Sequence, residues 1–348
     1  MLTVMRTKGE GAVKTTLERA QARYGELTMA RAVAFVPACN AVEALSRLVN
    51  VGPGDRIVAF MDDFEGPLRD AFATGDLRLL DTPAADAFVS ASSGHAPSYG
   101  DDASARLVWF VNSIGGNGLR VPDLRGLGRA ARSCGALLVV DNTVASYYGC
   151  RPLQLGAGLS LEAMDRLCGG QAPRKLVAVS VARSQLKRHR VDAMAEAAWR
   201  LFEDALPALE AISDDESSLI EASLEISSMR MQMHIDRARA LAEYLAANEA
   251  VPSVSYPGLA SHPDHLVASG VLMHGFGPAI DFVLPEGLSA GEAIDALPDG
   301  FRTSPAGGRV TRVSPLFGRD GRALRLFAGI DDPLQTASEL DRVLRARR

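Results

Sequence analysis

Apolar positions recur along the chain in two spacings, and the two spacings alternate. Stretches with apolar residues three and four apart predict amphipathic helices, and the clearest are residues 15–27, 40–50, 122–135 and 333–348. Short, nearly continuous apolar runs predict buried strands, and these are residues 56–60, 106–112 and 136–142. Helices placed between apolar strands indicate a largely parallel sheet, which binds ligands at the carboxyl ends of its strands. Asp141 stands at such an end.

The second half of the chain has a different pattern. Residues 184–233 predict helix without any strand, and the acidic stretch SDDESS lies past their middle. A further helix, a strand-like segment and two strands then precede the last helix, at residues 234–250, 252–258, 279–285 and 322–330. This order predicts a second, smaller α+β domain.

Composition narrows the class of protein. A chain of 348 residues is long enough for two domains, and 47% hydrophobic with 23% charged residues is ordinary for a globular protein. The net charge of −5 argues against a nucleic-acid or anionic-membrane partner. No segment has the length of a signal peptide core or a membrane span, so we expect a cytoplasmic protein. Lysine occurs only four times, which is typical of a GC-rich genome and offers a simple origin for a lysine-to-arginine exchange.

The four cysteines do not indicate a metal or disulfide framework. Cys39, Cys134, Cys150 and Cys168 have no CxxC spacing and no pairing pattern with histidine. The sequence also has no Ser-His-Asp arrangement, Walker loop or zinc spacing. We therefore expect no metal.

Four segments together resemble one enzyme family. They are LLVVDNTVASYYGCRPLQLGA, SYPGLASHPDH, GFGPAIDF and LRLFAGIDD. In this order they resemble the Cys/Met-metabolism family of pyridoxal-phosphate (PLP) enzymes, which includes cystathionine γ-synthases, cystathionine γ-lyases and methionine γ-lyases. The resemblance implies the α/β fold of fold-type I transferases. It divides the chain into a shortened N-terminal arm (1–15), a large domain with a mostly parallel sheet (16–210) and a C-terminal α+β domain (211–348).

Three residues match positions that the family uses. The resemblance implies that Asp141 pairs with the pyridine nitrogen of PLP and keeps it protonated, that Arg325 binds the substrate α-carboxylate through a bidentate pair, and that Phe64 stacks on the ring. Each has a simpler interpretation. Asp141 suits a turn or helix start, Arg325 suits an ordinary ion pair, and Phe64 suits an apolar core.

The position of the PLP lysine departs from the family pattern. The family reads S-x-T-K, and the register counted from Asp141 places Ala163, Met164, Asp165 and Arg166 there. An internal aldimine needs an amine that can lose its proton, whereas a guanidinium stays protonated. We therefore predict that Arg166 carries no covalent PLP.

The residues matching the phosphate site also depart from the pattern. Both hydroxyl residues are absent, and Asp165 brings a carboxylate to the place of a dianion. The turn whose amides face the phosphate reads Pro37, Ala38 and Cys39. The family's tyrosine and arginine from the neighbouring subunit align with Arg6 and Lys8, and its asparagine near the ring hydroxyl with Gly116 or Asn117. We still place the inherited cofactor pocket at Asp141, Phe64, Ala38, Cys39, Ala163 and Asp165.

No other residue clearly replaces the lysine. Lys175 precedes a predicted strand and is read as a solvated lysine, and Cys39 and Cys168 are read as ordinary small residues rather than nucleophiles. His234 and His262 lie in family segments and are predicted to be structural.

Three hypotheses follow. The first is a repurposed enzyme, in which Arg166 and Asp141 act on an amino-acid-like or carboxylate substrate by lyase- or transferase-type chemistry without an internal aldimine. The second is a catalytically dead homologue that serves as partner or scaffold of an active enzyme, such as a paralogue. The third is a PLP-dependent C–S lyase or γ-synthase that holds PLP non-covalently. The resemblance implies a homodimer or tetramer in each case. Alternatively, Arg166 pairs with Asp141 or Asp165 and closes the pocket.

Overall fold

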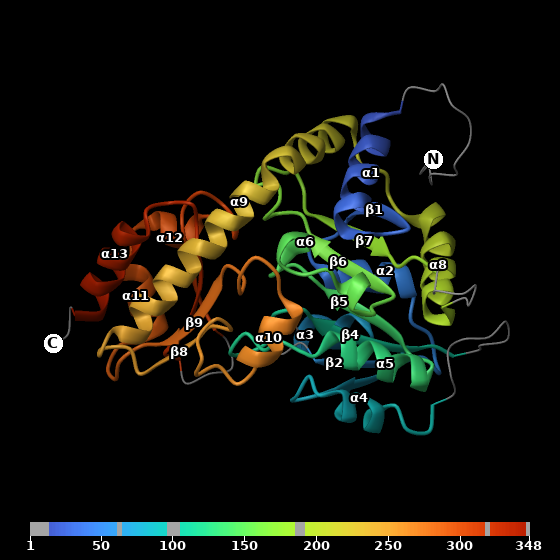
Figure 1. Cartoon of the computed structure of the whole chain (residues 1–348), viewed down its shortest axis with the longest axis horizontal. Helices are drawn as coiled ribbons and strands as arrows, with labels where there is room; N and C mark the ends of the chain where they lie inside the picture. The colour runs from blue at the N-terminus through green and yellow to red at the C-terminus, as the bar shows by residue number, and fades with distance from the viewer. Residues whose placement is uncertain (1–13, 61–64, 96–104, 185–191, 317–320, 346–348) are drawn as a thin grey trace.

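The computed structural model describes residues 14–60, 65–95, 105–184, 192–316 and 321–345, which form two sheets with helices around them (Figure 1). The larger sheet has seven strands in the order β1-β7-β6-β5-β4-β2-β3. Their bounds are β1 (Ala32–Pro37), β2 (Arg56–Phe60), β3 (Asp76–Leu79), β4 (Leu107–Asn112), β5 (Leu137–Asp141), β6 (Leu159–Ala163) and β7 (Leu176–Val181). The five strands from β6 to β3 run parallel, whereas β7 is antiparallel to both of its neighbours. The predicted mostly parallel α/β sheet is confirmed.

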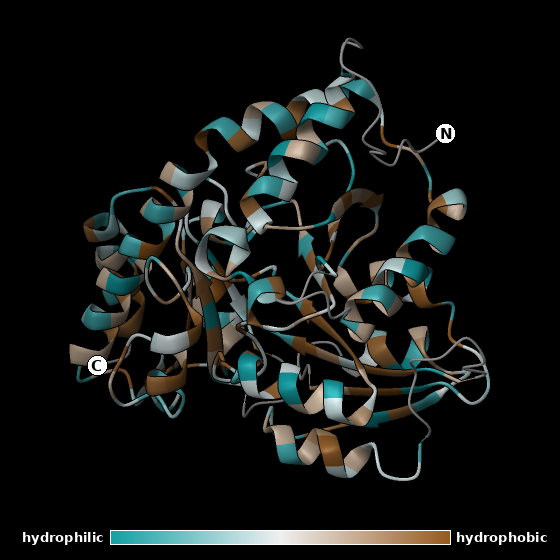
Figure 2. Cartoon of the chain, turned by 45° about the vertical axis from the view of Figure 1, so that its right-hand side comes forward, coloured by the Kyte–Doolittle hydropathy of each residue, from teal (hydrophilic) through white to brown (hydrophobic). Residues whose placement is uncertain are grey.

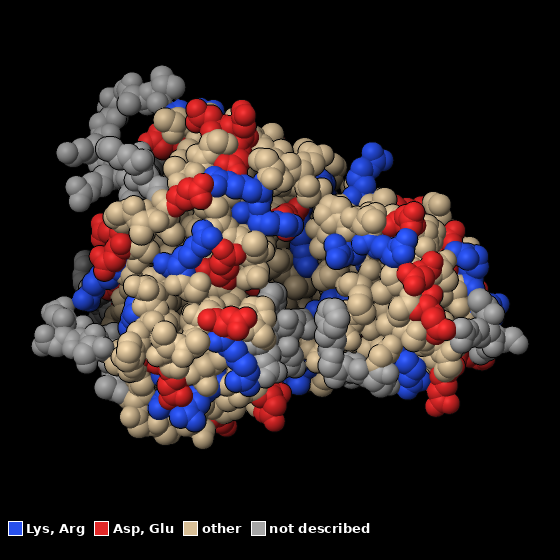
Figure 3. Space-filling model, turned by 180° about the vertical axis from the view of Figure 1, so that it is seen from behind, with Lys and Arg blue, Asp and Glu red and all other residues tan. Residues whose placement is uncertain are grey.

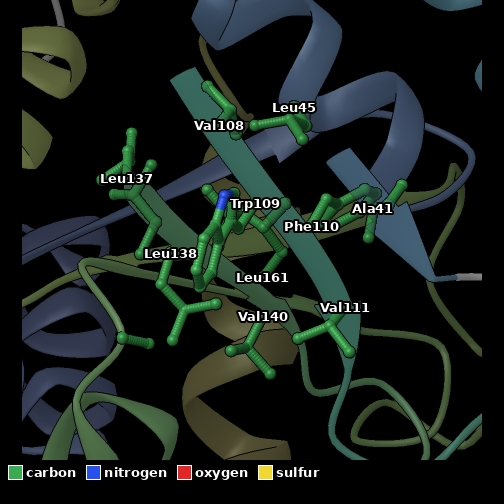
Figure 4. Close-up of a cluster of buried hydrophobic side chains, with 14 of the residues drawn as sticks. Ala41, Leu45, Val108, Trp109, Phe110, Val111, Leu137, Leu138, Val140 and Leu161 are labelled. Atoms are coloured by element: carbon green, nitrogen blue, oxygen red, sulfur yellow. The ribbon is translucent and has the colours of Figure 1, made fainter. Parts of the chain in front are cut away.

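The centre of this sheet is an apolar core. Strands β4, β5 and β7 are buried at every position, as expected of strands covered on both faces. Figure 4 shows Leu45 and Ala41 of helix α2 (Ala41–Val49) next to Val108 and Phe110 of β4. Trp109 is fully buried among these side chains. Its indole N–H donates to the Ser92 hydroxyl at 2.8 Å, so that burial leaves no polar atom of the ring without a partner.

The helices around the large sheet end where the sequence signals predict. Helix α1 (Thr16–Thr28) begins with a capping box between Thr15 and Glu18. Helix α5 (Leu124–Cys134) begins at Asp123 and ends at Gly135, whose φ of 69° suits glycine. The other helices of this half are α3 (Glu65–Ala71), α4 (Ala85–Ala91), α6 (Ser146–Gly149), α7 (Pro152–Leu155) and α8 (Ala193–Ala205). Figure 2 shows the hydrophobic strands enclosed between helices that carry hydrophilic residues.

The second sheet has four antiparallel strands in the order β10-β11-β9-β8. The strands are β8 (Ser253–Ser255), β9 (Ala279–Val283), β10 (Arg312–Pro315) and β11 (Ala323–Phe327). The helices of this half are α10 (His265–Val271), α11 (Ala290–Ala296), α12 (Asp299–Thr303) and α13 (Pro333–Arg345). Its apolar residues form a separate buried cluster.

One long helix joins the two halves, where the sequence predicts two separate ones. Helix α9 (Asp214–Ala247) has 34 residues and crosses from the large sheet to the second sheet (Figure 1). The predicted start of a new helix at residue 234 is wrong, because no glycine or proline interrupts the helix. Leu224 packs in a cluster with the first half of the molecule and Leu241 in the cluster of the second.

The surface charge and the apolar length of the helices bear on whether the protein binds nucleic acid or crosses a membrane. Acidic and basic side chains are interspersed on the face in Figure 3, which differs from the continuous basic face of a nucleic-acid-binding protein. Among the described helices, none combines the length and apolar character needed to cross a membrane.

Candidate active site

A cavity of about 500 Å³ lies where the carboxyl ends of β4, β5 and β6 face the second sheet. Of the residues predicted for the site, five line this cavity together with Asp141, namely Cys39, Ala163, Asp165, Arg166 and Arg325. Ala38 is buried beside Cys39 and is not among the lining residues. Phe64, Arg6 and Lys8 lie outside the described residues.

Asp141 is the last residue of β5, and the sheet register places it beside Asn112 of β4. Only 3% of Asp141 is exposed. Its Oδ1 accepts a hydrogen bond from the Thr143 backbone N–H at 2.9 Å. Burial raises the pKa of Asp141, while Thr143 and the charge of Arg166 act in the opposite direction. The side-chain oxygen of Asn112 is buried too and has no hydrogen-bond partner among the described residues.

Arg166 lies three residues beyond β6 and is only 6% exposed. Its Nη1 donates to the Val144 carbonyl at 3.0 Å, and its guanidinium lies 4.5 Å above the centre of the Phe327 ring. Burial lowers the pKa of Arg166 to about 10, so the side chain is still a cation at neutral pH. Gly307 makes room for this arginine, because a Cβ there would lie 2.6 Å from the Arg166 Cα.

Arg166 makes no ion pair with either neighbouring acid, although the charges of Asp141 and Asp165 oppose the lowering of its pKa by burial. Within the described ranges, no carboxylate lies within ion-pair distance of its guanidinium. Asp165 instead pairs with Lys175, whose Nζ is 2.5 Å from Oδ2. The expectation that Arg166 pairs with Asp141 or Asp165 and closes the pocket is therefore wrong, since the two acids have other partners and the cavity is open between them.

The turn before α2 has its backbone donors already occupied. The Ala38 N–H donates to the Lys175 carbonyl at 3.2 Å, and the Cys39 N–H donates to Glu43 Oε2 at 2.7 Å. The hydrogen bond from Cys39 lowers the pKa of Glu43, which therefore stays ionised. Arg47 pairs with the same carboxylate at 2.5 Å. A carboxylate of the chain thus holds the start of α2, where helix amides favour an anion.

Arg325 is held by an acid that the sequence analysis did not single out. Arg325 on β11 lies opposite Asp281 on β9. Its Nε donates to Oδ1 at 2.7 Å and its Nη2 to Oδ2 at 2.9 Å, and both side chains are more than nine-tenths buried. The Gly118 N–H also donates to Asp281, and the Gly116 carbonyl accepts from Arg325. Opposite charges at directly facing positions of two neighbouring strands would have predicted this ion pair, once β9 and β11 were known to be neighbours. The role of Arg325 in carboxylate binding stays a prediction, and a ligand carboxylate would have to share this guanidinium with Asp281.

The remaining candidates have structural partners. Lys175 is largely exposed and bound to Asp165. Burial raises the pKa of Cys168 to about 11, and the hydrogen bond with Glu43 raises that of Cys39, so neither favours a thiolate. His234 is buried with its Nδ1 bonded to the Ala328 carbonyl, and burial lowers its pKa to about 4. His262 bonds to the Gly118 carbonyl. The described residues contain no group of acids, histidines and cysteines that could hold a metal.

A second buried acid lies near the cavity without lining it. Glu162 on β6 accepts hydrogen bonds from the Tyr24 hydroxyl and the Tyr147 N–H, both at 2.7 Å and both to Oε2. Burial raises its pKa to about 8. This residue was not predicted, and its one signal is a charged position between the apolar Leu161 and Ala163.

Comparison with known proteins gives the family. The sequence profile described as "Cys/Met metabolism PLP-dependent enzyme" matches residues 15–301. The chain belongs to this family. It is 28% identical to an L-methionine gamma-lyase of Pseudomonas putida over 54% of this chain and 44% of that protein. It is 27% identical to the cystathionine gamma-synthase of Mycobacterium tuberculosis over 95% of this chain and 84% of that protein.

A solved structure of the family has the same fold. The apo structure of CalE6, a methionine gamma-lyase from Micromonospora echinospora, matches with a TM-score of 0.76 and 26% identity, over 94% of this chain and 85% of that one. Five of the curated relatives are matched over only 44 to 59% of their own length.

Proposed function

We propose that this chain is a family member that works without an internal aldimine, and that its cavity binds an amino-acid-like or carboxylate substrate directly. One observation carries the proposal. Arg166 stands where the register from Asp141 expects the PLP lysine, and it lines the cavity beside that acid. Arginine cannot supply the neutral amine that an aldimine requires.

The residues present do not fit PLP as the family holds it. The Cys39 N–H, which would face the phosphate, is bonded to Glu43, and the Ala38 N–H is bonded to a backbone carbonyl. Asp165 adds a carboxylate at the rim of the same region, and its partner is Lys175. A phosphate dianion here would have to displace one acid and approach another, which electrostatics opposes.

The cavity nevertheless keeps groups that suit acid–base and electrostatic work. Asp141 is a buried acid with a raised pKa, so it can exchange a proton closer to neutral pH than a solvated aspartate. Arg166 supplies a fixed positive charge in the same cavity. Together they support lyase- or transferase-type chemistry at a carboxylate-bearing substrate, in which Asp141 moves a proton and Arg166 stabilises negative charge.

A second function is favoured by the same structure. Glu43 accepts the hydrogen bond of the Cys39 N–H, which the family uses for the phosphate, and Asp281 forms an ion pair with Arg325. Two groups that would bind ligand in the family therefore bind carboxylates of the chain itself. That is what a catalytically dead partner or scaffold protein would show. Arg166 argues against it, because a partner protein has no need of a buried cation without a counter-ion in an open cavity.

We further propose a homodimer or tetramer in the cytoplasm. Ile226 and Met229 lie one helical turn apart on α9 and are 49% and 63% exposed. An apolar pair of this kind supports burial against a second chain. Sedimentation at micromolar concentration tests the assembly, and a monomer would contradict it.

The test of the proposed function is a spectrum of the purified protein with and without added PLP, followed by borohydride reduction and mass measurement. We expect no absorbance from an aldimine and no added pyridoxyl mass. Reduction onto any lysine would overturn the proposal. An absorbing species that dialysis removes would favour non-covalently held PLP. Failure of every amino acid and small carboxylate to bind, measured by calorimetry, would favour the dead homologue.

A further inference from the structure

We propose that Arg166, and not Arg325, binds the carboxylate of the ligand, and that Asp281 decides this by holding Arg325. The inference rests on the proposed function, because it assumes that the cavity takes an amino-acid-like ligand. Arg166 would recognise the ligand carboxylate, and Asp281 would keep Arg325 from binding it.

Arg166 has the properties of an anion receptor. Its guanidinium offers five N–H donors, and among the described residues it has one hydrogen-bond acceptor, the Val144 carbonyl, and no carboxylate partner. The bond to Val144 and the contact with the Phe327 ring fix the plane of the guanidinium. A fixed fork in a buried place favours bidentate binding of a carboxylate. A bound anion would also give a direct ion pair to a buried cation that makes none among the described residues.

Arg325 is buried and lines the same cavity, but it differs from Arg166 in having a carboxylate partner. Asp281 already takes the Nε and Nη2 edge that would bind a carboxylate in a bidentate way. Asp281 is itself held by the Gly118 N–H at 2.9 Å. A ligand carboxylate at Arg325 would therefore lie against a buried acid with which it would have to compete.

Two hydrogen-bond acceptors, Asn112 and Asp141, are placed to bind the ammonium group of the ligand. Asn112 and Asp141 are register neighbours at the ends of β4 and β5, and both line the cavity. The Asn112 oxygen is buried without a partner among the described residues. Gly115 permits this position of the amide, since a Cβ there would lie 2.5 Å from the Asn112 Cγ. A ligand ammonium group would satisfy the amide oxygen and the Asp141 carboxylate together. The ligand class is therefore an α-amino acid, with its carboxylate toward Arg166 and its ammonium toward Asp141.

Calorimetry with three related probes separates the two poles. The probes are L-methionine, 4-(methylthio)butanoate, which lacks the ammonium group, and 3-(methylthio)propylamine, which lacks the carboxylate. Arg166→Met should weaken binding of the two acids by at least about tenfold, the loss expected for one charge-assisted pair. It should leave the amine within about twofold. Arg239→Met, an exposed arginine paired with Glu243, is the matched control and should bind all three as the wild type does.

A second variant tests the part assigned to Asp281. In the Arg166→Met background, Asp281→Asn removes the charge that holds Arg325, and acid binding should recover by several fold. If Arg166→Met does not fold, as circular dichroism will show, Arg166→Gln keeps a donor for Val144 and replaces it.

The outcomes distinguish the inference from the proposed function. Unchanged binding of the acids in Arg166→Met or Arg166→Gln overturns the inference and leaves the proposed function standing. Equal losses for the acids and the amine also overturn it, because they would mean collapse of the cavity. Failure of acid binding to recover in the double variant overturns the part assigned to Asp281. If the wild type binds none of the three probes at millimolar concentration, the proposed function itself is rejected.

Discussion

The two arginines of the cavity share a site but differ in how their charge is compensated. Arg325 lies in a pair with Asp281 that satisfies both side chains, and Arg166 lies over an aromatic ring with one carbonyl as its partner. The first arrangement is complete without a ligand, and the second is not. The difference shows that a buried charge marks a binding site through its missing partner rather than through burial itself.

The largest predicted loss of stability comes from removing one partner of the buried Arg325–Asp281 pair. Arg325→Met takes the guanidinium away from the buried Asp281 carboxylate, and the free energy of unfolding should fall by about 3–5 kcal/mol. Urea denaturation measures it. Replacing both partners together, as Arg325→Met with Asp281→Leu, should cost much less, because no charge is left alone. A single variant as stable as the wild type would mean that Asp281 has another counter-ion.

Arg166→Met should behave in the opposite way in the absence of ligand. Removing a buried cation that makes no direct ion pair among the described residues costs little or stabilises the chain, so we expect a change in unfolding free energy within about 1 kcal/mol. Urea denaturation of this variant beside Arg325→Met makes the contrast directly. A loss of the size expected for Arg325→Met would show that Arg166 has an ionic partner after all.

The free energy of unfolding should depend on pH because of the buried acid Glu162. Its pKa is raised from 4.5 to about 8, so the folded state binds a proton more tightly than the unfolded state. The stability that this proton contributes is complete below pH 4.5 and is lost as the pH rises toward 8, with a slope of at most about 1.4 kcal/mol per pH unit.

Unfolding by urea between pH 5 and pH 8 measures this slope, and Glu162→Gln should flatten it. Glutamine is a matched replacement, because both donors reach the same oxygen, Oε2. Equal slopes in the two proteins would assign the pH dependence to other groups.

The fold was largely predictable because it depends on apolar periodicity, which local sequence displays. The runs that became β4 and β5 were recognised, and with them the position of Asp141 at a strand end. Strands β1, β3, β6 and β10 were not predicted, and the junction in α9 was misplaced although no helix-breaking residue lies there.

The site was predictable only where a residue matches a motif. Arg166, Asp141 and Arg325 were found in this way, and the cavity brings them together. Glu43 and Asp281 were missed because their importance lies in what they touch. A carboxylate at the third residue of a helix, or within a strand, has no local sign that it bonds to a turn amide or to an arginine 44 residues away.

The smallest expected effect is the most informative about the old cofactor site. Arg166→Lys places an amine at the position proposed for the PLP lysine, yet we expect no detectable turnover of cystathionine or methionine with added PLP. Glu43 would still bind the Cys39 N–H, and Asp165 would still lie at the rim with its charge. Adding Glu43→Gln removes the acid at the turn and should raise PLP retention, measured by absorbance after gel filtration, above that of the single variant. Turnover by Arg166→Lys alone would show that the lysine was the only essential loss, and that the carboxylates now at the phosphate turn give way readily to a dianion.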